Sequence, residues 1–352
     1  MKELPEGYEE ASKQTGALRR RRGAAKSPSD LMWLMLTNLA QGLTLLNTSA
    51  LALASGLGKM SDVAFMKRLR NSDQWFKWIL RRMASAGVAD YLKPRGLEGY
   101  RVLAVDASDV NSGISRFAKR WHLHFALDIF TLACRQMKIT GEEVGETLAN
   151  FTVATGDLLL GDRAYGTLRS IAHCLSGGAD FILRLKSGAF TMRSPDGVRI
   201  DPPAILKEAE PGVAVEIPVC VELGGHGLGQ VQLRLCVLRK SEEQIQKSHE
   251  RINRRDSKSQ ASTSEAAKDF NEHIAPITSL PVAISAAEVL GAYRYRWQIE
   301  MWFKRLKSLL GVGEIPKKHP AAMEAWLNGK MVLALLYEVL LSKLDFSPLG
   351  ER

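Results

Sequence analysis

Apolar residues recur at helical spacing through the first 95 positions. Helices are expected in four places: from Ser29 or Asp30, over residues 43–55, from Ser61, and over DQWFKWILRRM. The first part of the chain is therefore predicted to be all-α.

The segment 31–58 contains no charged residue and is long enough to span a membrane. Asn, Gln, Thr and Ser side chains interrupt it, and each would be costly in hydrocarbon. We therefore expect two buried helices joined near Gly42. Because the acidic start of the chain is not that of a signal peptide, a cytoplasmic protein without a membrane partner is expected.

From Gly99 the spacing of apolar residues changes from that of helices to that of β-strands. Short apolar runs between turn residues predict strands at RVLAVD, WHLHFALDIF, LACRQMKIT, DLLLGD and DFILRLK. The segments GETLANF and TLRSIAHCL, between the later strands, are expected to be helices. Three successive strands followed by strands alternating with helices predict a mixed α/β sheet.

Residues 188–275 interrupt this order. Alternation of apolar residues over 213–223 and again over 231–237, around GGHGLG, predicts a β-hairpin with one buried face. The polar stretch SEEQIQKSHERINRRDSKSQASTSEAAKD is expected to be a solvated helix or a loop. The chain then returns through a strand at PITSLP, a long helix over about 285–310, and a final helix AAMEAWLNGKMVLALLYEVLLSKL.

The composition is that of a basic globular protein. Forty-eight Lys and Arg against 38 Asp and Glu give a net charge of +10, and most of the excess lies in residues 1–95. Such a balance favours a polyanionic partner such as nucleic acid. The four cysteines form no C-x-x-C pair, which argues against a zinc finger or a disulfide scaffold. The basic region opens with a run of four arginines, Arg19, Arg20, Arg21 and Arg22.

The helix expected from Ser61 combines an apolar face with basic side chains. Val63, Met66 and Leu69 share the face that is predicted to be buried. Its basic residues are Lys67, Arg68 and Arg70. Short helices with a basic third member resemble a helix-turn-helix array that could enter a DNA groove, and a solvated helical face is the alternative.

Three carboxylates stand out by position. Asp106 ends the strand VLAV, Asp162 ends the strand LLLG, and Glu300 lies on the long helix. Carboxylates gathered where a sheet ends repel one another unless a cation neutralises them, and oxygen ligands suit Mg²⁺ or Mn²⁺. Two such ions could support phosphoryl transfer.

The long helix adds a polar face around Glu300. Tyr293, Arg296, Glu300 and Lys307 fall within an arc of about 60° on an uninterrupted helix, with Lys304 close by. An acid flanked by cationic side chains suits a nucleic-acid backbone. An ordinary amphipathic helix with a charged outer face remains the alternative.

The spacing Tyr293-x2-Arg296-x3-Glu300-x6-Lys307 resembles the Y-(2)-R-(3)-E-(6)-K signature of insertion-sequence transposases of the "IS-four" type. GDRAYG around Asp162 is similar to the family's D-R motif, and Arg163 is then an orienting residue or a phosphate contact. The resemblance implies that Asp106, Asp162 and Glu300 are the catalytic metal ligands. It also implies that Tyr293, Arg296 and Lys307 contact the end of the element's DNA.

The implied reaction is hydrolysis at the 3′ end of a terminal inverted repeat, followed by attack of the freed 3′-OH on target DNA. A two-metal site holding Mg²⁺, with Mn²⁺ able to substitute, would serve it. The implied partners are double-stranded DNA and a second copy of the chain in a DNA-bound homodimer, in a bacterial cytoplasm at the nucleoid.

The resemblance implies an RNase H-like α/β core that a β-rich insertion splits, preceded by an all-α DNA-binding domain. The final helix would pack on the core or on a second protomer. The expected parts are residues 1–95 (helical and basic), 96–187 (first part of the core), 188–275 (insertion), 276–318 (second part, with Glu300) and 319–352 (final helix).

The insertion departs from one family pattern. Relatives that release the element through a DNA hairpin hold a flipped base with an aromatic residue, often Trp in the insertion. Here residues 188–275 contain no Trp, and Phe190 and Phe270 are the only aromatics. The hairpin step is therefore not predicted from the sequence.

Several other polar residues have structural interpretations. Asp109 is expected to cap or solvate a turn, and Asp128 to lie at a sheet edge. His122 and His124 face the same side of a strand but have no third soft ligand for zinc nearby. Glu146 matches a Gly-Glu pair of the family, although a helix N-terminus is reason enough for an acid there.

Two rival functions share these features. A metal-dependent nuclease of the same fold would cut DNA without joining strands. A catalytically silent copy would act as a DNA-binding repressor, and an intact acid triad argues against it.

Overall fold

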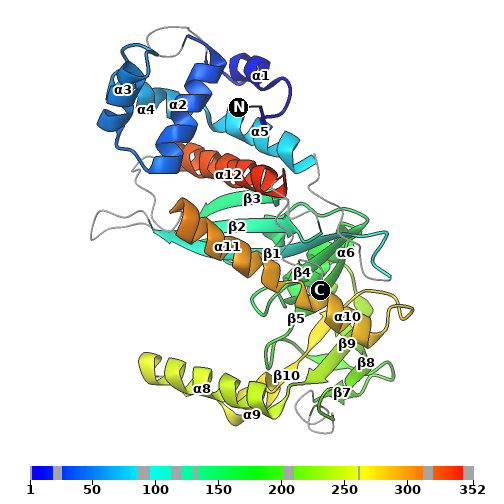
Figure 1. Cartoon of the computed structure of the whole chain (residues 1–352). Helices are drawn as coiled ribbons and strands as arrows, with labels where there is room; N and C mark the ends of the chain where they lie inside the picture. Colours follow the sequence, from blue (N-terminus) through cyan, green and yellow to red (C-terminus); the bar gives the residue numbers. More distant parts are fainter. Residues whose placement is uncertain are drawn as a thin grey trace, which may run out of the picture.

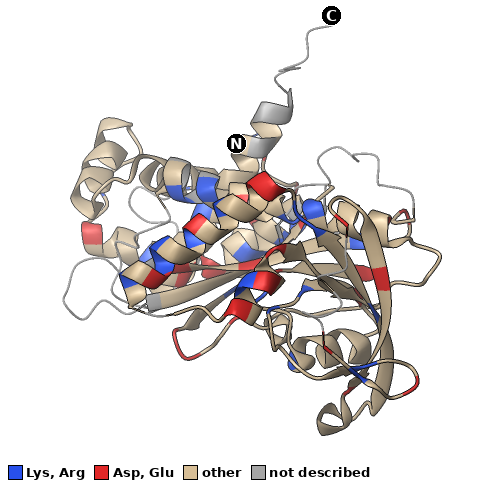
Figure 2. Ribbon diagram, turned by 90° about the horizontal axis from the view of Figure 1, so that it is seen from below, with Lys and Arg blue, Asp and Glu red and all other residues tan. Residues whose placement is uncertain are grey.

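The computed structural model describes residues 2–18, 26–85, 96–111, 120–130, 134–201, 206, 210–260, 262–311 and 320–343. The chain forms a mixed α/β structure in which one large sheet runs through the molecule, with a helical layer at one end (Figure 1). The mixed sheet and its helices confirm the predicted mixed α/β class. Lys, Arg, Asp and Glu lie mainly on helices and loops, and fewer of them lie on the strands (Figure 2).

The helical layer combines both ends of the described chain. Its helices are α1 (Tyr8–Gln14), α2 (Pro28–Gln41), α3 (Leu45–Ala54), α4 (Asp62–Asn71), α5 (Asp73–Ser85) and α12 (Pro320–Lys343). The final helix, α12, packs against α5, α2 and α4 (Figure 1). The sequence instead predicts that it packs on the core or on a second protomer. Gly329 allows this close approach, because a Cβ there would lie 2.5 Å from Leu39 and 3.1 Å from Phe76.

The first half of the sheet has the strand order β3-β2-β1-β4-β5. Strands β1, β2 and β3 pair antiparallel, whereas β1, β4 and β5 are parallel neighbours. The bounds are β1 (Arg101–Asn111), β2 (Arg120–Asp128), β3 (Cys134–Gly141), β4 (Asp157–Gly161) and β5 (Asp180–Arg184). All five expected strands are therefore present.

Helices cover both faces of this half. On one face lies α11 (Trp297–Leu310), and its Phe303 packs edge-on against Phe125 of β2 with ring centres 5.3 Å apart, whereas α10 (Ala286–Arg294) packs on β8, β9 and β11 in the other half of the sheet. On the other face α6 (Leu168–Ser176) contributes Ile171 to a core with Leu159 and Phe181. Because side chains alternate along a strand, each strand supplies both cores.

The insertion continues the same sheet. The order runs on from β5 through β11, β9, β8, β6 and β7, and β10 pairs with β9. The expected hairpin is formed by β8 and β9, and the polar stretch after it forms α8 and α9. The bounds are β6 (Met192–Arg193), β7 (Arg199–Ile200), β8 (Ala214–Glu222), β9 (Gln230–Arg239), α8 (Glu242–Ser259), α9 (Glu265–Asn271), β10 (His273–Ile274) and β11 (Pro276–Thr278).

Two expected helices are different in the structure. The helix over 285–310 is broken, because α10 ends at Arg294 and α11 begins at Trp297. At the break, short-range hydrogen bonds run from Arg296 N to Tyr293 O and from Gln298 N to Tyr295 O. GETLANF forms only a 3₁₀ turn over Leu148–Asn150.

Three expectations for the helical layer were wrong in detail. The first long helix is capped by Ser27, whose hydroxyl accepts from Asp30 N, and not by Ser29 or Asp30. Helix α3 is largely exposed, with Leu46 at 73 %. Val63 is also exposed, and α4 is buried through Phe65 and Leu69. Among the described residues, no helix is both long and apolar enough to cross a membrane.

Candidate active site

The two strand-borne carboxylates lie on neighbouring parallel strands. Ala104 of β1 is level with Leu160 of β4, so two further residues along each strand lead to Asp106 and Asp162. Asp106 Oδ1 accepts a hydrogen bond of 2.8 Å from Ala107 N, and Asp162 Oδ1 accepts one of 2.8 Å from Ala164 N. The sheet and local backbone donors thus fix both side chains. Asp162 directly follows β4 as expected, whereas Asp106 lies within β1, which continues to Asn111 along its antiparallel partner β2, so the prediction that Asp106 ends its strand was wrong.

The environment of Asp106 disfavours its charged form. Burial, helped by the nearby Asp162 and Glu146 carboxylates, raises the pKa of Asp106 to about 7 against the opposing effects of the Ala107 N–H and of Arg296. Burial and Asp162 also raise the pKa of Glu146. Carboxylates placed together in this way favour a neighbouring cation.

Glu300 comes to the site from a helix. It lies in the first turn of α11, and Arg296 Nη2 donates to its Oε1 at 2.5 Å. Its side chain is 55 % exposed. The single helical face expected for the four signature residues was wrong because the helix breaks at Arg296, but the break still leaves Arg296 and Glu300 in contact.

A cavity of about 570 Å³ connects the strand-borne and helix-borne parts. Asp106 lines it from β1, and Glu300, Lys304 and Lys307 line it from α11. Its remaining lining residues are Ala107, Ser108, Phe303 and Ser308. Two carboxylates thus share a hollow with two lysines, an arrangement that suits a phosphate chain brought close to an acid centre.

A cationic cluster lies beside Asp162. Tyr293 is buried, and the Arg296 guanidinium lies 5.8 Å from the centre of its ring. Burial and the nearby Arg184 lower the pKa of Arg163 to about 10. The Arg163 Nε is buried and finds no hydrogen-bond acceptor among the residues that the structure describes. An unsatisfied buried donor of this kind suits an anionic ligand.

Sequence reasoning missed Arg184 and Lys240 in this cluster. Arg184 ends β5, which pairs in parallel with β4, so the strand-end argument used for Asp162 would have found it. Lys240 follows β9 in the insertion, and burial with the neighbouring Arg184 and Arg163 lowers its pKa to about 8. No local signal marks Lys240, because only the pairing of distant strands brings it here.

The three carboxylates have the chemistry of a metal site. All are hard oxygen donors, which Mg²⁺ and Mn²⁺ require. Within the described part of the chain, however, no three His, Cys, Asp or Glu side chains converge closely enough to hold one ion. Asp106 and Asp162 fit in charge and placement, whereas Glu300 is engaged by Arg296.

The other predicted DNA contacts lie elsewhere. Lys67 and Arg70 are exposed on α4 in the helical layer, and burial lowers the pKa of the half-buried Arg68. The run of Arg19, Arg20, Arg21 and Arg22 lies outside the described residues.

Two acids differ from their expected settings. Asp109 is a strand residue of β1, not a turn residue, and its Oδ1 lies 3.6 Å from His122 Nε2. Asp128 ends the interior strand β2, not a sheet edge, and is buried with Arg135 at 3.0 Å. His124 is buried, and burial lowers its pKa to about 4.

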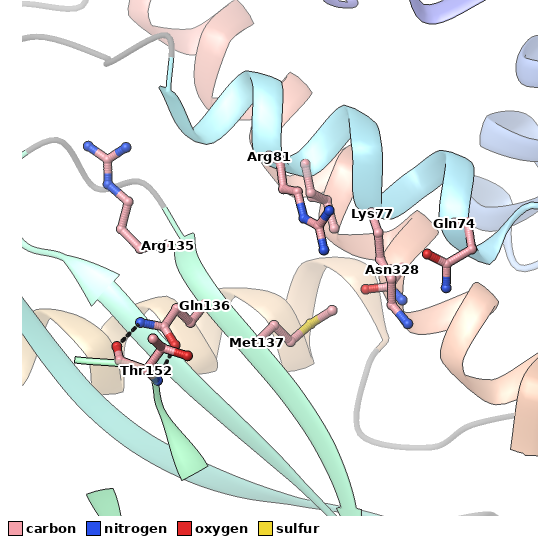
Figure 3. A pocket seen from close by; sticks show the side chains of 9 residues that line it. Gln74, Lys77, Arg81, Arg135, Gln136, Met137, Thr152 and Asn328 are labelled. Carbon is pink, nitrogen blue, oxygen red and sulfur yellow. Dashed lines mark hydrogen bonds between the residues drawn. The ribbon is translucent and has the colours of Figure 1, made fainter. Parts of the chain in front are cut away.

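A second cavity, of about 610 Å³, lies between α5, β3 and α12 (Figure 3). Its cations are largely neutralised: Lys77 lies 2.8 Å from Asp73 and 3.4 Å from Glu324, and Arg135 pairs with Asp128. It is lined by Gln74, Lys77, Leu80, Arg81, Arg135, Gln136, Met137, Thr152 and Asn328. None of the predicted catalytic residues reaches it.

Several known proteins are similar in sequence to this chain over most of its length. The model of the transposase DDE domain matches residues 98–336. The chain is 30 % identical to the putative transposase InsL for insertion sequence element IS186A of Escherichia coli K12, over 98 % of this chain and 93 % of that protein. Identity to the transposase for insertion sequence element IS421 of Escherichia coli is also 30 %, with the same coverage.

These matches confirm the resemblance carried by the Tyr293–Lys307 signature. Members of this family transpose DNA and generally use divalent metal ions. The chain belongs to the transposase DDE domain family.

Proposed function

We propose that Asp106, Asp162 and Glu300 form the catalytic centre of a transposase that cleaves the 3′ ends of its element and joins them to target DNA. One observation carries the assignment: Asp106 and Asp162 lie two residues beyond the last pair of the parallel strands β1 and β4, and Glu300 and two lysines line the cavity beside Asp106.

The strand order supports an RNase H-like core. Three antiparallel strands, β3-β2-β1, are followed by two parallel ones, β4 and β5, with α6 on one face and α11 on the other. The proposed acids then lie just past the point where the parallel pairing of β1 with β4 ends, and ligands of open α/β sheets bind beyond the carboxyl ends of parallel strands.

Asp106 and Asp162 would hold Mg²⁺, with Mn²⁺ able to substitute, in a two-metal site. Such ions lower the pKa of an attacking water or hydroxyl and stabilise the oxygen that leaves phosphorus. Glu300 would join the two aspartates once its ion pair with Arg296 opens. The break in the helix allows the ion pair to open. Arg296 lies in the break between α10 and α11, so its side chain can move without unwinding the first turn of α11, which carries Glu300.

The cations around the acids would bind and orient the DNA. Lys304 and Lys307 line the cavity beside Asp106, where they can neutralise phosphates next to the cleaved bond. Arg296, once released from Glu300, would bind a phosphate beside Tyr293, and the unsatisfied Arg163 Nε would bind another. Holding the phosphate in line with the attacking oxygen supplies the positioning part of catalysis.

The helical layer would recognise the terminal inverted repeats through Lys67, Arg68 and Arg70 of α4 and through the run Arg19, Arg20, Arg21 and Arg22. Because transposition brings two ends together, we expect a homodimer in the DNA-bound complex. Both ideas extend the family assignment to this chain.

The proposal is tested with purified wild-type protein and Glu300→Gln. The substrates are a duplex carrying the inverted repeat that flanks the coding region and a supercoiled target, with Mg²⁺, Mn²⁺ or EDTA. Metal-dependent nicking at the repeat boundary and joining to the target, both lost in the variant, are expected. Nicking without joining would establish a nuclease instead, and binding with neither would leave a repressor.

A further inference from the structure

The exposed helix α8 of the insertion carries its cations on one flank. Its five cations fall within an arc of about 100° that contains none of its four acids, although Glu243 and Glu250 border the arc. The cations are Lys247, Arg251, Arg254, Arg255 and Lys258; the acids are Glu242, Glu243, Glu250 and Asp256. We call the first set the cationic flank. All five of its side chains belong to exposed residues.

The buried side of α8 and its acid Asp256 make contacts within the insertion. Ile245 and Ile252, two turns apart, are the buried residues of the helix. His249 Nε2 lies 3.4 Å from Glu272, and Asp256 Oδ2 accepts a hydrogen bond of 2.8 Å from Thr263 N. These contacts fix the rotation of the helix and leave the cationic flank turned away from its anchoring side.

The cationic flank lies next to the cluster around Asp162. Lys240 Nζ donates to Ser248 Oγ of α8 at 2.9 Å, so the helix is joined directly to the cluster. The positive charges of Arg255 and Arg251 also contribute to the lowered pKa values of Arg163 and Lys240. Arg255 is also held in place, because its Nη2 donates to Thr263 Oγ1 at 2.7 Å. Cationic groups therefore continue from the catalytic carboxylates onto the insertion.

We propose that the cationic flank of α8 binds the phosphate backbone of the DNA duplex where it continues away from the catalytic carboxylates. This inference rests on the proposed function, because it assigns a further part of the same DNA path. Figure 1 places α8 at the end of the molecule opposite the helical layer, so this contact would be separate from any made by α4.

The dimensions of the flank suit a phosphate chain. From Arg251 to Lys258 the helix rises about 10 Å, a length over which one DNA strand presents about three phosphates. The flank contains no aromatic side chain that could stack on a base. Binding should therefore depend on charge and salt and should be independent of sequence.

The test compares wild-type protein with the triple variant Arg251→Gln, Arg254→Gln, Lys258→Gln. Arg255 and Lys247 are left intact because both make contacts within the protein. Binding to a fluorescent duplex of about 40 base pairs is measured by anisotropy in EDTA, from about 50 to 200 mM salt, with two unrelated sequences.

Loss of three phosphate contacts should make the slope of log affinity against log salt shallower by about 2.7. Over that fourfold rise in salt, the wild type should then weaken about 40-fold more than the variant. Arg251→Lys with Arg254→Lys should behave as wild type, since charge is kept. Glu250→Gln, just outside the cationic flank, is the matched control and should not make the slope shallower.

An unchanged slope in a variant that unfolds at the wild-type temperature would overturn the proposal. So would a change of oligomeric state at constant slope, which would assign the flank to a protein partner. If the triple variant does not fold, Arg254→Gln and Lys258→Gln are measured singly, each with an expected change in slope of about 0.9. Failure of wild-type protein to nick DNA would count against the proposed function and leave this binding comparison intact.

Discussion

The two parts of the proposed active site are held in different ways. Asp106 and Asp162 belong to paired strands, and each accepts a 2.8 Å hydrogen bond from the backbone of its own turn or strand. Glu300 belongs to a helix that follows a break, is 55 % exposed, and is paired with an arginine. The strand-borne part is therefore preformed, whereas the helix-borne part has to exchange an ion pair before it can join.

The largest expected effect is on DNA cleavage, and it tests whether the strand-borne and the helix-borne carboxylates are both needed for catalysis. Asp106→Asn, Asp162→Asn and Glu300→Gln should each reduce cleavage of repeat DNA by about 1000-fold or more, because each removes a proposed metal ligand. DNA binding in EDTA should persist in all three. A Glu300→Gln protein that cleaves within about tenfold of wild type would remove the helix-borne part from the catalytic centre.

The next effect concerns how α11 is docked. Phe303→Ala removes a buried ring that packs against Phe125 and should lower the free energy of unfolding by about 3–4 kcal/mol. Urea unfolding measures this loss. Lys304→Ala, one residue further on the exposed side of α11, is the control and should change stability by less than about 0.5 kcal/mol. Equal effects of the two would mean that the ring does not dock the helix.

A smaller effect tests the ion pair. Arg296→Gln should release Glu300, so that half-maximal cleavage needs less Mg²⁺, while the rate at saturating Mg²⁺ falls about 10–100-fold because a phosphate contact is lost. Arg296→Lys keeps the charge and should retain the wild-type Mg²⁺ requirement. A rise in the Mg²⁺ requirement of Arg296→Gln would contradict competition between the arginine and the ion.

The smallest effect is a pH dependence of the strand-borne part. The pKa of Asp106 is raised from 3.8 to about 7, so the stability that its neutral form provides is complete below about pH 4 and is lost as pH rises through 7. In EDTA, Asp106→Asn should therefore be more stable than wild type at pH 8, by about 1–3 kcal/mol. Thermal unfolding at pH 5 and pH 8 measures the difference. A Glu300→Gln protein with the same gain would show that the effect is not specific to the strand.

The strand-borne acids could be predicted because their signal is local. An apolar run followed by Asp identifies both strands, and the register of β1 with β4 brings Asp106 level with Asp162, although β1 itself continues to Asn111. The same argument extends to Arg184, which sequence reasoning left out. The large mixed sheet and the hairpin of the insertion could be predicted in the same way, from the alternation of apolar and polar residues along each strand.

The helix break at Tyr295 and Arg296 could not be predicted in the same way. The segment YRYRW contains neither Gly nor Pro, so its local preference is for an uninterrupted helix. The exposure of α3 was missed for a related reason. The spacing of apolar residues in a segment predicts a helix, but it does not show whether another element covers that helix. Both depend on packing between distant parts of the chain.

The arrangement of α12 has a consequence for synthesis of the protein. The apolar side chains of α2 and α5 are covered by Trp326, Leu327 and Met331, which leave the ribosome after the whole catalytic sheet. N-terminal segments normally fold first as a chain emerges, but here the helical layer has to wait for its last member. A chain truncated before Pro320 would leave α2 and α5 uncovered and prone to aggregate, so only full translation yields a complete helical layer.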